Sequence, residues 1–340
     1  MDANINDMIK TTVVSARVRL ARNIAGVPFP NKLFDAGLAA KVIDDAINSI
    51  GELNGYRFFR TSELSETHKL WLVEKELISK ELAVAPFGAA LISGDESVSV
   101  MFHEEDHIRE QSFTREFALK DAYAALKKID DEICLKTDVA RDRDFGYLTS
   151  CPTNLGLGLR ASVMLFLPAL TAEKKMERTA RYLKERGMTV RGVYGEGSAF
   201  DGYMYQISNQ SSFKLDAEEI IDAVSATAID VIKAENQRRE TLAKEGLHEL
   251  TDGAYRAYGI LTNAFKISFR EALELISRLK LGISVGIIGD IAYSADLDRL
   301  ITTIKPANLS MRAGKDLTPG ERDVYRAEII KKSIDFKKEG

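Results

Sequence analysis

Cysteine is scarce in this sequence, because only Cys134 and Cys151 occur among its 340 residues. Two cysteines exclude a disulfide framework and are typical of a protein in a reducing compartment. Long apolar runs are also missing, and the first residues do not show the basic and then apolar order of a signal peptide. We therefore expect a cytoplasmic protein that does not enter a membrane.

An excess of positive charge is missing as well. The chain has 47 Lys and Arg residues against 51 Asp and Glu residues, which gives a formal net charge of −4. A protein with this balance cannot hold nucleic acid nonspecifically through bulk charge, so we expect no nucleic-acid partner. Hydrophobic residues make up 45% of the chain, which is enough for a sizeable core in a globular protein.

What is present is a change of pattern along the chain. Before residue 212, strand-like segments alternate with helical ones. Strands are predicted over residues 13–20, on both sides of the Gly94-Asp95 turn, and as a pair over 189–197 and 203–210. Helical periodicity extends over residues 38–50 and 114–133.

After residue 212 the patterns are helical only. Residues 216–244 predict one long helix. Ser268 with Glu271 predicts the start of another helix, and Thr318 with Pro319 and Glu321 predicts the start of the last one. We expect an α+β domain over residues 1–212 and an all-helical domain over residues 213–340.

The stretch from His103 to His107, HEEDH, matches the H-E-x-x-H pattern of zinc proteases. That chemistry needs both imidazoles on one helix face, but this stretch follows a strand-like run directly. The other two histidines, His68 and His248, stand in no supporting motif. We therefore expect no metal site built by the protein. Taken alone, the segment is a solvated acidic loop.

Arginines beside strand ends and glycine turns form a second pattern. Arg17 and Arg19 are two residues apart, so on a strand both point to one face. Three more arginines stand next to the acidic loop or to glycine-rich runs: Arg109, Arg160 and Arg191. Each alone is more often a surface side chain, but together they suit a polyphosphate. Gly156 and Gly158 would let backbone N–H groups approach phosphates, although the sequence has neither a P-loop nor a Rossmann fingerprint.

The motifs SARVRLARN, HEEDHIR, SCPTNLGLGLRASV and RGVYGEG, in this order, resemble the phosphagen (guanidino) kinase family. The match covers most of residues 13–210, and the run CPTNLGLGLRAS is highly specific. In layout the chain resembles the bacterial protein-arginine kinases, in which a helical domain follows the kinase domain. The resemblance implies an α+β fold: a glutamine-synthetase-like guanidino kinase domain with an antiparallel sheet flanked by helices, then an all-helical C-terminal domain.

The resemblance also implies roles for individual residues. Glu105 and Glu196 match the two carboxylates that grip the substrate guanidinium, and Cys151 matches the active-site cysteine beside them. The HEEDH stretch is then a substrate-binding loop. The positions that match the ATP-binding segments of the family are Ser15, Ala16, Arg17, Val18, Arg19, Arg109, Arg160, Ala161, Ser162, Val163, Met164, Arg191, Gly192, Val193, Tyr194, Gly195 and Glu196.

These roles make chemical sense. A guanidinium has a pKa above about 12 and is a poor nucleophile, so it has to be aligned with the γ-phosphorus and has to lose a proton. Two carboxylates can chelate it, and one can act as the base. Arginines and Mg²⁺ supply the positioning and charge stabilisation that phosphoryl transfer from ATP needs. Cys151 could act as a thiolate beside the cations, although a small buried hydrophobe is the alternative for this residue.

Four positions depart from the usual family pattern. Leu157 stands where the family usually has Thr, and His103 stands where Asn is usual. Two histidines often found near the nucleotide are replaced by Glu76 and Met164, although the Met is also usual in protein-arginine kinases. Glu76 therefore puts the contact to adenine in doubt. None of these changes removes a residue that the mechanism requires.

The last predicted helix contains the sequence ERDVYRA. Arg322 and Arg326 are four residues apart and share one helix face, while Asp323 precedes Arg326 by three. An ordinary solvated ion pair would explain this spacing. The sequence RDVYRA also resembles the R-D-x-x-R-A motif of protein-arginine kinases. That resemblance implies a phosphoarginine pocket made by Arg322, Asp323, Arg326 and Ala327, which couples binding to activity.

The hypothesis from the sequence is a kinase that transfers the γ-phosphoryl group of ATP to arginine side chains of proteins. The resemblance implies roles in stress response and protein quality control, with an Hsp100-type unfoldase or protease, a heat-shock repressor and an activator protein as partners, and a homodimer. One alternative is a kinase of a free guanidino compound such as L-arginine; in such relatives a helical domain precedes the first arginine pair, whereas 14 residues precede Ser15 here. The other alternative is a phosphoarginine-binding adaptor without catalytic activity.

Overall fold

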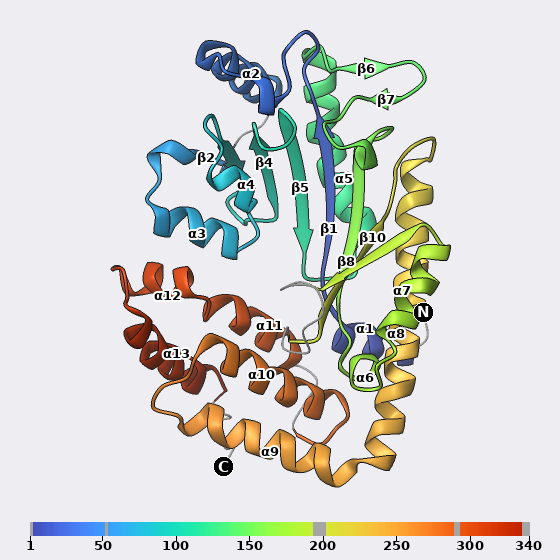
Figure 1. The fold of residues 1–340 in the computed structure, drawn as a ribbon, viewed down its shortest axis with the longest axis vertical. Coiled ribbons are helices and arrows are strands. Elements are labelled where there is room, and N and C mark those ends of the chain that lie inside the picture. Colours follow the sequence, from blue (N-terminus) through green and yellow to red (C-terminus); the bar gives the residue numbers. More distant parts are fainter. Residues whose placement is uncertain (1–2, 52–53, 193–201, 289–292, 335–340) are drawn as a thin grey trace.

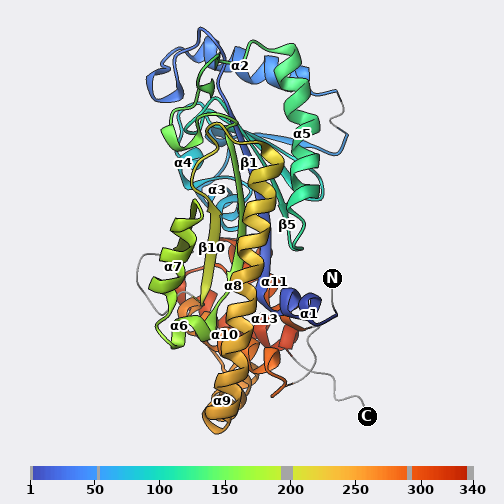
Figure 2. The same ribbon diagram turned by 90° about the vertical axis from the view of Figure 1, so that its right-hand side faces the viewer.

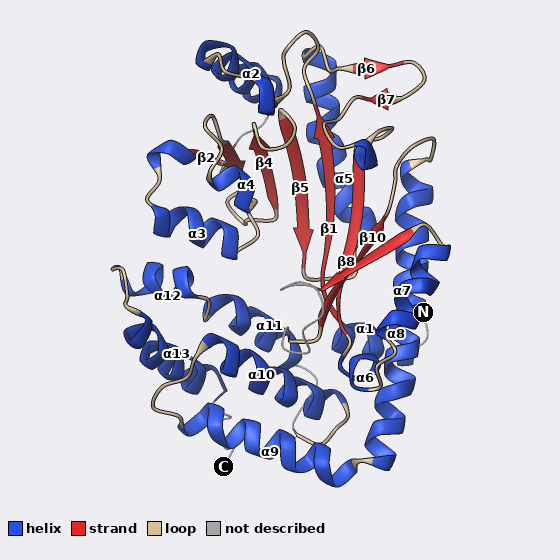
Figure 3. Cartoon of the chain, in the orientation of Figure 1, coloured by secondary structure: helices blue, strands red, loops and turns tan. Residues whose placement is uncertain are grey.

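The structure is a computed structural model, and it describes residues 3–51, 54–192, 202–288 and 293–334. It consists of a mixed sheet-and-helix domain and a group of helices beside it (Figure 1). Figure 3 shows the strands gathered in the sheet and the helices grouped beside it, and the described strands lie between Val13 and Asn209. None of the described helices is both long and apolar enough to cross a membrane.

The described strands form an eight-stranded antiparallel sheet in the order β2-β3-β4-β5-β1-β8-β10-β9, with a separate two-stranded ribbon of β6 and β7. The strands are β1 (Val13–Arg22), β2 (Arg57–Arg60), β3 (Ala89–Ile92), β4 (Val98–Phe102), β5 (Ile108–Thr114), β6 (Arg141–Asp142), β7 (Gly146–Tyr147), β8 (Leu159–Phe166), β9 (Met188–Gly192) and β10 (Met204–Asn209).

The helices of the first part are α1 (Ala3–Thr12), α2 (Ala36–Ser49), α3 (Glu66–Glu74), α4 (Lys80–Ala83), α5 (Leu119–Lys136), α6 (Pro168–Ala172), α7 (Met176–Glu185) and α8 (Ala217–Glu245). Short 3-10 turns extend over Pro30–Lys32, Thr61–Glu63 and Pro152–Asn154. The helices of the second part are α9 (Leu247–Asn263), α10 (Phe269–Ser284), α11 (Tyr293–Thr303), α12 (Pro306–Ala313) and α13 (Pro319–Ile334).

Helices cover one face of the central sheet. Val18 and Leu20 alternate with arginines on β1, and they join a core with apolar residues of α2, α5 and α8. Figure 2 shows α5 and α8 lying along this face. Burial of these apolar side chains is the main force that holds the sheet against the helices. On the opposite face, α3 and α4 pack against Ala90, Ile92 and Met101 of β3 and β4, and the arginine side chains that alternate with Val18 and Leu20 on β1 point to this same face.

A second core holds the helical domain together and joins it to the sheet. Residues of α9 to α13 pack with Phe166 of β8 and Met204 of β10, at the ends of these strands. A buried ion pair between Lys280 Nζ and Asp298 Oδ2 at 2.6 Å links α10 to α11. The helical domain is therefore attached at the end of the sheet where β1 begins (Figure 1).

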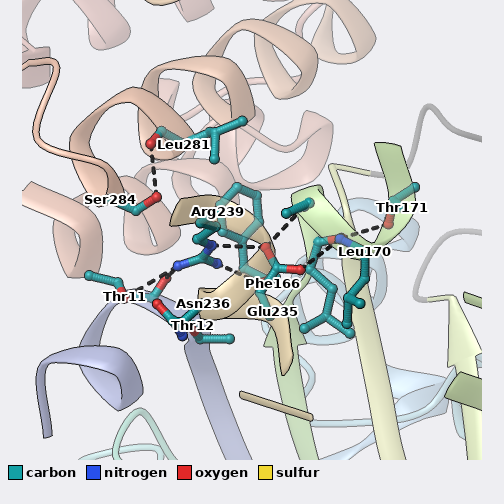
Figure 4. A network of polar contacts seen from close by, with 12 residues as sticks. Thr11, Thr12, Phe166, Leu170, Thr171, Glu235, Asn236, Arg239, Leu281 and Ser284 are labelled. Carbon is teal, nitrogen blue, oxygen red and sulfur yellow. Dashed lines mark hydrogen bonds and ion pairs between the residues drawn. The ribbon is translucent and has the colours of Figure 1, made fainter. Parts of the chain in front are cut away.

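The long helix α8 belongs to both parts. Residues from Ile220 to Ile232 pack on the sheet, whereas its last turns lead into α9. The expected boundary at residue 212 stays a prediction, and this packing favours a boundary closer to Gly246. A buried network fixes α8: Arg239 Nε donates to Glu235 Oε1 at 2.8 Å, and Arg239 Nη2 donates to the carbonyl of Phe166 at 2.8 Å (Figure 4).

Most helices and strands occur where the sequence predicts them. The hairpin around Gly94-Asp95 joins β3 to β4, and the predicted pair of strands is β9 with β10. Ser268 caps α10, and Thr318 exchanges hydrogen bonds with Glu321 at the start of α13. One boundary differs: the helix predicted from residue 114 begins at Leu119, because β5 continues through Thr114.

Candidate active site

The strand register puts the five predicted arginines on one face of the sheet. Arg19 lies directly opposite Arg160 of β8 and Gln111 of β5. Residues directly opposite each other in a sheet point to the same face, and every second residue of a strand does so too. The same reasoning, applied strand by strand, gives one shared face to Arg17 and Arg19 on β1, Arg109 on β5, Arg160 on β8 and Arg191 on β9. We call this the arginine face.

The arginine face contains guanidiniums whose hydrogen-bonding capacity is only partly used by the described residues. The Nε atoms of Arg17, Arg19 and Arg160 are buried and have no hydrogen-bond partner among the described residues. Burial, and then the positive charges of Arg17, Arg109 and Arg160, lowers the pKa of Arg19 well below its ordinary value. An unpaired buried polar group costs about 1–3 kcal/mol, more when it is charged. A polyanion would supply the missing acceptors and relieve the repulsion.

Two carboxylates already contact arginines on this face. Glu104 forms an ion pair with Arg109, and Glu76 Oε2 lies 3.5 Å from Arg17 Nη1. The sequence did not predict either ion pair, although Glu76 stands out in it as a departure from the family pattern. Glu76 has a positive φ of 61°, which a non-glycine residue rarely adopts, so the chain holds this side chain in place at some cost. Neither pair involves Arg19, which has no carboxylate in an ion pair with it among the described residues.

The HEEDH stretch is a turn between β4 and β5. The backbone N–H of His103 donates to the carbonyl of His107 at 2.9 Å, which closes the turn. His107 Nδ1 accepts from the N–H of Ile24 at 3.0 Å, and His107 Nε2 lies 2.8 Å from the carbonyl of Pro28. Both ring nitrogens of His107 therefore hold the loop in place. The one-turn helical spacing that a zinc protease needs is not formed by these residues.

A buried polar network attaches this turn to the segment that contains Cys151. Asp106 Oδ1 accepts from Asn23 Nδ2 and from the backbone N–H of Ser150, both at 2.7 Å. Ser150 Oγ donates to the carbonyl of Glu105 at 2.7 Å. The network brings Glu105 and Cys151 together at the far end of the arginine face from the helical domain. Asn23, Asp106 and Ser150 were missed from the sequence, because only the long-range contact reveals their roles.

Glu105 itself is exposed beside this network. Partial desolvation, and then the negative charge of Asp106, raises the pKa of the Glu105 carboxyl, while Arg109 opposes the shift. A carboxylate with a raised pKa is a better proton acceptor at neutral pH. Cys151 Sγ lies 3.0 Å from Thr153 Oγ1, and Cys151 is among the groups close enough to Arg160 to interact with it electrostatically. Glu105 and Cys151 therefore adjoin the arginine face.

The glycine-rich run before Arg160 packs closely on β1. Gly158 has a φ of 64°, and a Cβ atom there would lie 2.6 Å from the carbonyl oxygen of Ala21. Arg22 Nη1 donates to the carbonyl of Leu157 at 2.9 Å, which fixes the loop. The structure thus requires glycine at position 158 for close backbone packing. A contact between this loop and phosphates stays a prediction.

The other predicted ATP-binding positions are divided between the two faces of the sheet. Ser15, Ser162 and Met164 share the arginine face, whereas Ala16, Val18, Ala161 and Val163 are buried in the core beneath it. Gly192 ends β9. The remaining predicted positions lie outside the described residues: Val193, Tyr194, Gly195 and Glu196.

The predicted phosphoarginine motif lies on α13. Arg326 is buried, and it donates through Nε to the carbonyl of Ile304 at 3.0 Å and through Nη1 to the carbonyl of Ile267 at 2.8 Å. Asp323 Oδ1 accepts from the same Nη1 at 2.5 Å. Arg326 therefore stabilises the packing of α13, together with the buried Ala327. Arg322 is half-buried on the same helix, and a phosphate-binding role of this motif stays a prediction.

Comparison with known protein families agrees with this geometry. The model of the "ATP:guanido phosphotransferase, C-terminal catalytic domain" matches residues 39–238. The model of the "Protein-arginine kinase McsB C-terminal domain" matches residues 247–340. The chain belongs to the protein-arginine kinase family. It is therefore an ATP:guanidino phosphotransferase, and it uses ATP.

Relatives in the protein-arginine kinase family match along most of their length. The protein-arginine kinase of Halothermothrix orenii is 40% identical over 327 residues, which are 95% of this chain and 93% of the relative. The protein-arginine kinase of Bacillus subtilis is 38% identical over 333 residues, which are 96% of this chain and 91% of the relative.

Solved structures share the guanidino kinase fold. The substrate-free duplicated taurocyamine kinase from Schistosoma mansoni aligns with a TM-score of 0.62 at 20% identity, over 78% of this chain and 41% of that one. Lombricine kinase aligns with a TM-score of 0.59 at 21% identity, over 71% of this chain and 70% of that one. At these identities the likeness concerns the fold alone, and it confirms the fold expected from the sequence.

Proposed function

We propose that this member of the family transfers the γ-phosphoryl group of ATP to arginine side chains of proteins. The observation that carries the proposal is the arginine face, where three guanidiniums have buried Nε atoms with no partner in the described part of the chain. Arg17, Arg19 and Arg160 would bind the phosphates, because charge-assisted hydrogen bonds to phosphate oxygens satisfy these atoms. Arg109 and Arg191 extend the cationic surface to either side.

Glu105 is the proposed contact for the acceptor guanidinium. Its carboxylate can accept hydrogen bonds from two guanidinium nitrogens and take up the proton that leaves during transfer. Cys151 lies on the segment that Ser150 fastens to Glu105, so it can orient the same guanidinium. Glu196 is proposed as the second carboxylate on the strength of the family pattern.

Mg²⁺ is expected to accompany ATP. The described residues include no group of three or more His, Cys, Asp or Glu side chains that could hold a metal ion. Mg²⁺ usually keeps several waters and binds through substrate phosphates rather than through a protein cage. The donor set of the arginine face therefore fits a metal ion held by the nucleotide, where it would neutralise charge on the phosphates.

The wider role is proposed from the family alone. We expect a cytoplasmic homodimer that marks unfolded or exposed proteins, works with an Hsp100-type unfoldase or protease, inactivates a heat-shock repressor and responds to an activator protein. We also propose that the Arg322 motif on α13 binds phosphoarginine and alters activity.

The test of the proposed function is phosphotransfer to two acceptors. The purified protein is incubated with Mg-ATP and either a denatured protein or free L-arginine, and the acid-labile P–N bond is detected by mass spectrometry and ³¹P NMR. Phosphate on protein arginines with free arginine unchanged supports the proposal. Phosphorylated free arginine would make the chain a kinase of a small guanidino compound, and phosphoarginine binding without transfer to either acceptor would favour an adaptor.

A further inference from the structure

Asn23 directly follows β1 and is completely buried. Its amide nitrogen Nδ2 donates to Asp106 Oδ1 at 2.7 Å and to the carbonyl of Leu148 at 3.0 Å. Its amide oxygen Oδ1 accepts from the backbone N–H of His107 at 2.9 Å. Both donors and the oxygen of the amide therefore have partners, and these partners determine which way the amide faces.

These contacts join three segments that carry different parts of the proposed site. Asn23 continues β1, the strand of Arg17 and Arg19. Its side chain holds the HEEDH turn, which contains Glu105, and it also holds the segment that leads to Cys151. One buried side chain thus connects the phosphate-binding strand to both acceptor-side segments.

Asp106 extends this connection. Its Oδ1 atom accepts from Asn23 and also from the backbone N–H of Ser150, both at 2.7 Å. Ser150 Oγ in turn donates to the carbonyl of Glu105 at 2.7 Å. A buried carboxylate depends on such donors, because a charge without hydrogen bonds is costly in the interior. Removal of the Asn23 amide would take away one of the two donors to Asp106 Oδ1.

The strand β1 relates this junction to the phosphate-binding arginines. It pairs with β5 on one side and with β8 on the other, so it is held along its length. A strand rises about 3.3 Å per residue, so Arg19 and Asn23 are separated by roughly 13 Å. The end of the strand is also held, because Arg22 forms a buried ion pair with Asp130.

Phosphoryl transfer is sensitive to this separation. The acceptor nitrogen has to be aligned with the γ-phosphorus, and a misplacement of about 1 Å can cost about a hundredfold in rate. We propose that Asn23 is a positioning residue that fixes Glu105 and the Cys151 segment relative to the phosphate-binding arginines. The inference rests on the proposed function, since it takes the acceptor guanidinium to lie at Glu105. Because Asn23 is completely buried, it acts through these residues and not by contact with a substrate.

The HEEDH turn has further supports that do not involve the Asn23 side chain. His107 Nδ1 accepts from the N–H of Ile24 at 3.0 Å, and the carbonyl of His107 accepts from the N–H of His103 at 2.9 Å. His107 Nε2 lies 2.8 Å from the carbonyl of Pro28. Loss of the Asn23 amide should therefore loosen the turn without unfolding it.

The first experiment compares Asn23→Ala with Asn236→Ala. Asn236 is a matched control, because its Nδ2 also bridges two segments, donating to Thr12 Oγ1 at 3.1 Å and to the carbonyl of Ile232 at 2.9 Å (Figure 4). Thr12 directly precedes β1, so this control lies at the other end of the strand from Asn23. The kcat for transfer to a denatured protein, the KM for ATP and the melting temperature are measured for both variants and the wild type.

The expected result is a fall in kcat of about a hundredfold in Asn23→Ala, with the KM for ATP within about twofold of wild type. Asn236→Ala should keep kcat within about twofold, even where its melting temperature falls as much. A folded Asn23→Ala protein with kcat within about threefold of wild type would overturn the proposal. A raised KM for ATP with unchanged kcat would overturn it too, because Asn23 would then act on the nucleotide.

Asn23→Asp tests the hydrogen bond itself. The substitution places a second carboxyl beside Asp106, where the wild type has an N–H donor. Two carboxylates this close share one proton, and one of their pKa values is raised. The protonated pair can form the hydrogen bond that the amide forms. The ratio of the variant's kcat to that of the wild type should therefore rise as the pH falls, by at most about tenfold per pH unit. A ratio that does not change with pH would overturn the role of this hydrogen bond.

The ratio to wild type cancels the other titrations near Asp106. The charge of Asp106 acts on Glu105 and on His107. Burial lowers the pKa of His107 below its ordinary value of about 6.5, so its ring is mainly neutral in a series from about pH 6.5 to 9. Glu105 is also affected by three other charged residues: Arg109, Glu104 and Glu81. All these groups are present in both proteins.

A control for the pH series is Asn236→Asp. The partners of Asn236 are a hydroxyl and a backbone carbonyl, neither of which is charged. The kcat ratio of this variant to wild type should therefore stay constant over the same pH range. A ratio that rises equally in both variants would overturn the proposal, because the effect would then not depend on Asp106.

The choice of acceptor separates the inference from the function on which it rests. A wild-type protein that phosphorylates free L-arginine but no protein arginines would overturn the proposed function. A fall in kcat of Asn23→Ala with free L-arginine would then still support the positioning role. A wild-type protein that phosphorylates protein arginines, together with a fully active Asn23→Ala variant, would do the reverse.

Discussion

Arg19 and Arg22 lie three residues apart on β1 and point to opposite faces of the sheet. On the helix-covered face, Arg22 forms a two-pronged ion pair with Asp130 at 2.7 and 2.8 Å, and its guanidinium lies 3.7 Å from the ring of Tyr147. On the arginine face, Arg19 Nε is buried without a partner among the described residues. The same side chain is thus satisfied on one face and left unpaired on the other.

Two other buried arginines follow the example of Arg22. Arg239 and Arg326 are each 2% exposed, and each donates to backbone carbonyls and to a nearby carboxylate. Such residues stabilise the fold, because every buried donor has an acceptor. The difference teaches where to look for function: among the described residues, the arginines whose buried Nε atoms lack a partner collect on one face, whereas Arg22, Arg239 and Arg326 lie at contacts between helices and strands.

The largest expected effect is on catalysis at Arg19. Substitution by Met should lower phosphotransfer about a thousandfold, because a preorganised cation is lost from the phosphates. The free energy of unfolding should stay the same or rise, since an unpaired buried charge is removed. Steady-state transfer assays and urea unfolding of the same sample check both statements. Transfer within tenfold of wild type would mean that Arg19 does not contact the phosphates.

The matched substitution Arg22→Met should act mainly on stability. Removing one partner of a buried ion pair costs about 3–5 kcal/mol, because Asp130 is left as an uncompensated charge. The double variant Arg22→Met with Asp130→Asn should recover part of this loss. Chemical denaturation measures the free energy of unfolding. A single variant as stable as the wild type would remove the distinction between the two faces.

Glu105→Gln tests the end of the arginine face where the acceptor guanidinium is proposed to bind. Transfer should fall about a hundredfold or more, because a general base contributes about that much. The pKa of Glu105 is raised, and only the ionised form accepts a proton. The phosphotransfer rate of the wild type should therefore decline as the pH falls through a pKa above the ordinary value for Glu. The variant should not show this decline. The pH profile of kcat/KM measures it, and an unchanged profile in the variant would contradict the role.

Arg322→Ala tests the motif on α13 with less expected damage than a change at Arg326. Phosphoarginine affinity should fall about tenfold, which corresponds to one charge-assisted hydrogen bond. Arg326→Ala is unsuitable as a binding test, because its guanidinium donates to the carbonyls of Ile304 and Ile267. Calorimetry with free phosphoarginine gives the affinity. No change in Arg322→Ala would place phosphoarginine binding elsewhere.

The smallest expected effect concerns Glu110 on the helix-covered face. Both of its carboxylate oxygens are buried without a partner among the described residues, and burial raises its pKa well above the ordinary value. The folded protein therefore keeps a proton that the unfolded chain loses above about pH 4.3. Stability should fall as the pH rises from there, by at most about 1.4 kcal/mol per pH unit.

Glu110→Gln should remove this contribution and flatten the dependence of stability on pH. Urea unfolding at several pH values above 5 checks the slope. A slope that is the same in both proteins would show that Glu110 titrates normally in the fold.

Much of the fold could be predicted from the sequence, because local patterns determine it. Alternation in residues 13–20 predicted β1, the Gly94-Asp95 turn predicted the hairpin, and Ser268 predicted the start of α10. The shared face of Arg17 and Arg19 followed from the two-residue period of a strand. Motif order then predicted the family.

What could not be predicted depends on contacts between distant segments. The link from Asn23 through Asp106 to Ser150 joins residues more than 40 positions apart, and nothing in the local sequence marks it. The hydrogen bond from the backbone N–H of Ala307 at the start of α12 to the Glu74 carboxylate is similar, since it joins residues 233 positions apart. Arg326 was predicted to bind a ligand, but its backbone acceptors become visible only when the helices are packed.

The most direct test of the account is a crystal structure with a non-hydrolysable Mg-ATP analogue. The account predicts phosphate oxygens within hydrogen-bonding distance of Arg17, Arg19 and Arg160, with their buried Nε atoms satisfied and the γ-phosphate toward Glu105. Arg22, Arg239 and Arg326 should keep the partners they have now. An analogue bound away from the arginine face, with these three Nε atoms still without partners, would contradict the central claim that the arginines with unsatisfied buried Nε atoms are the phosphate-binding ones.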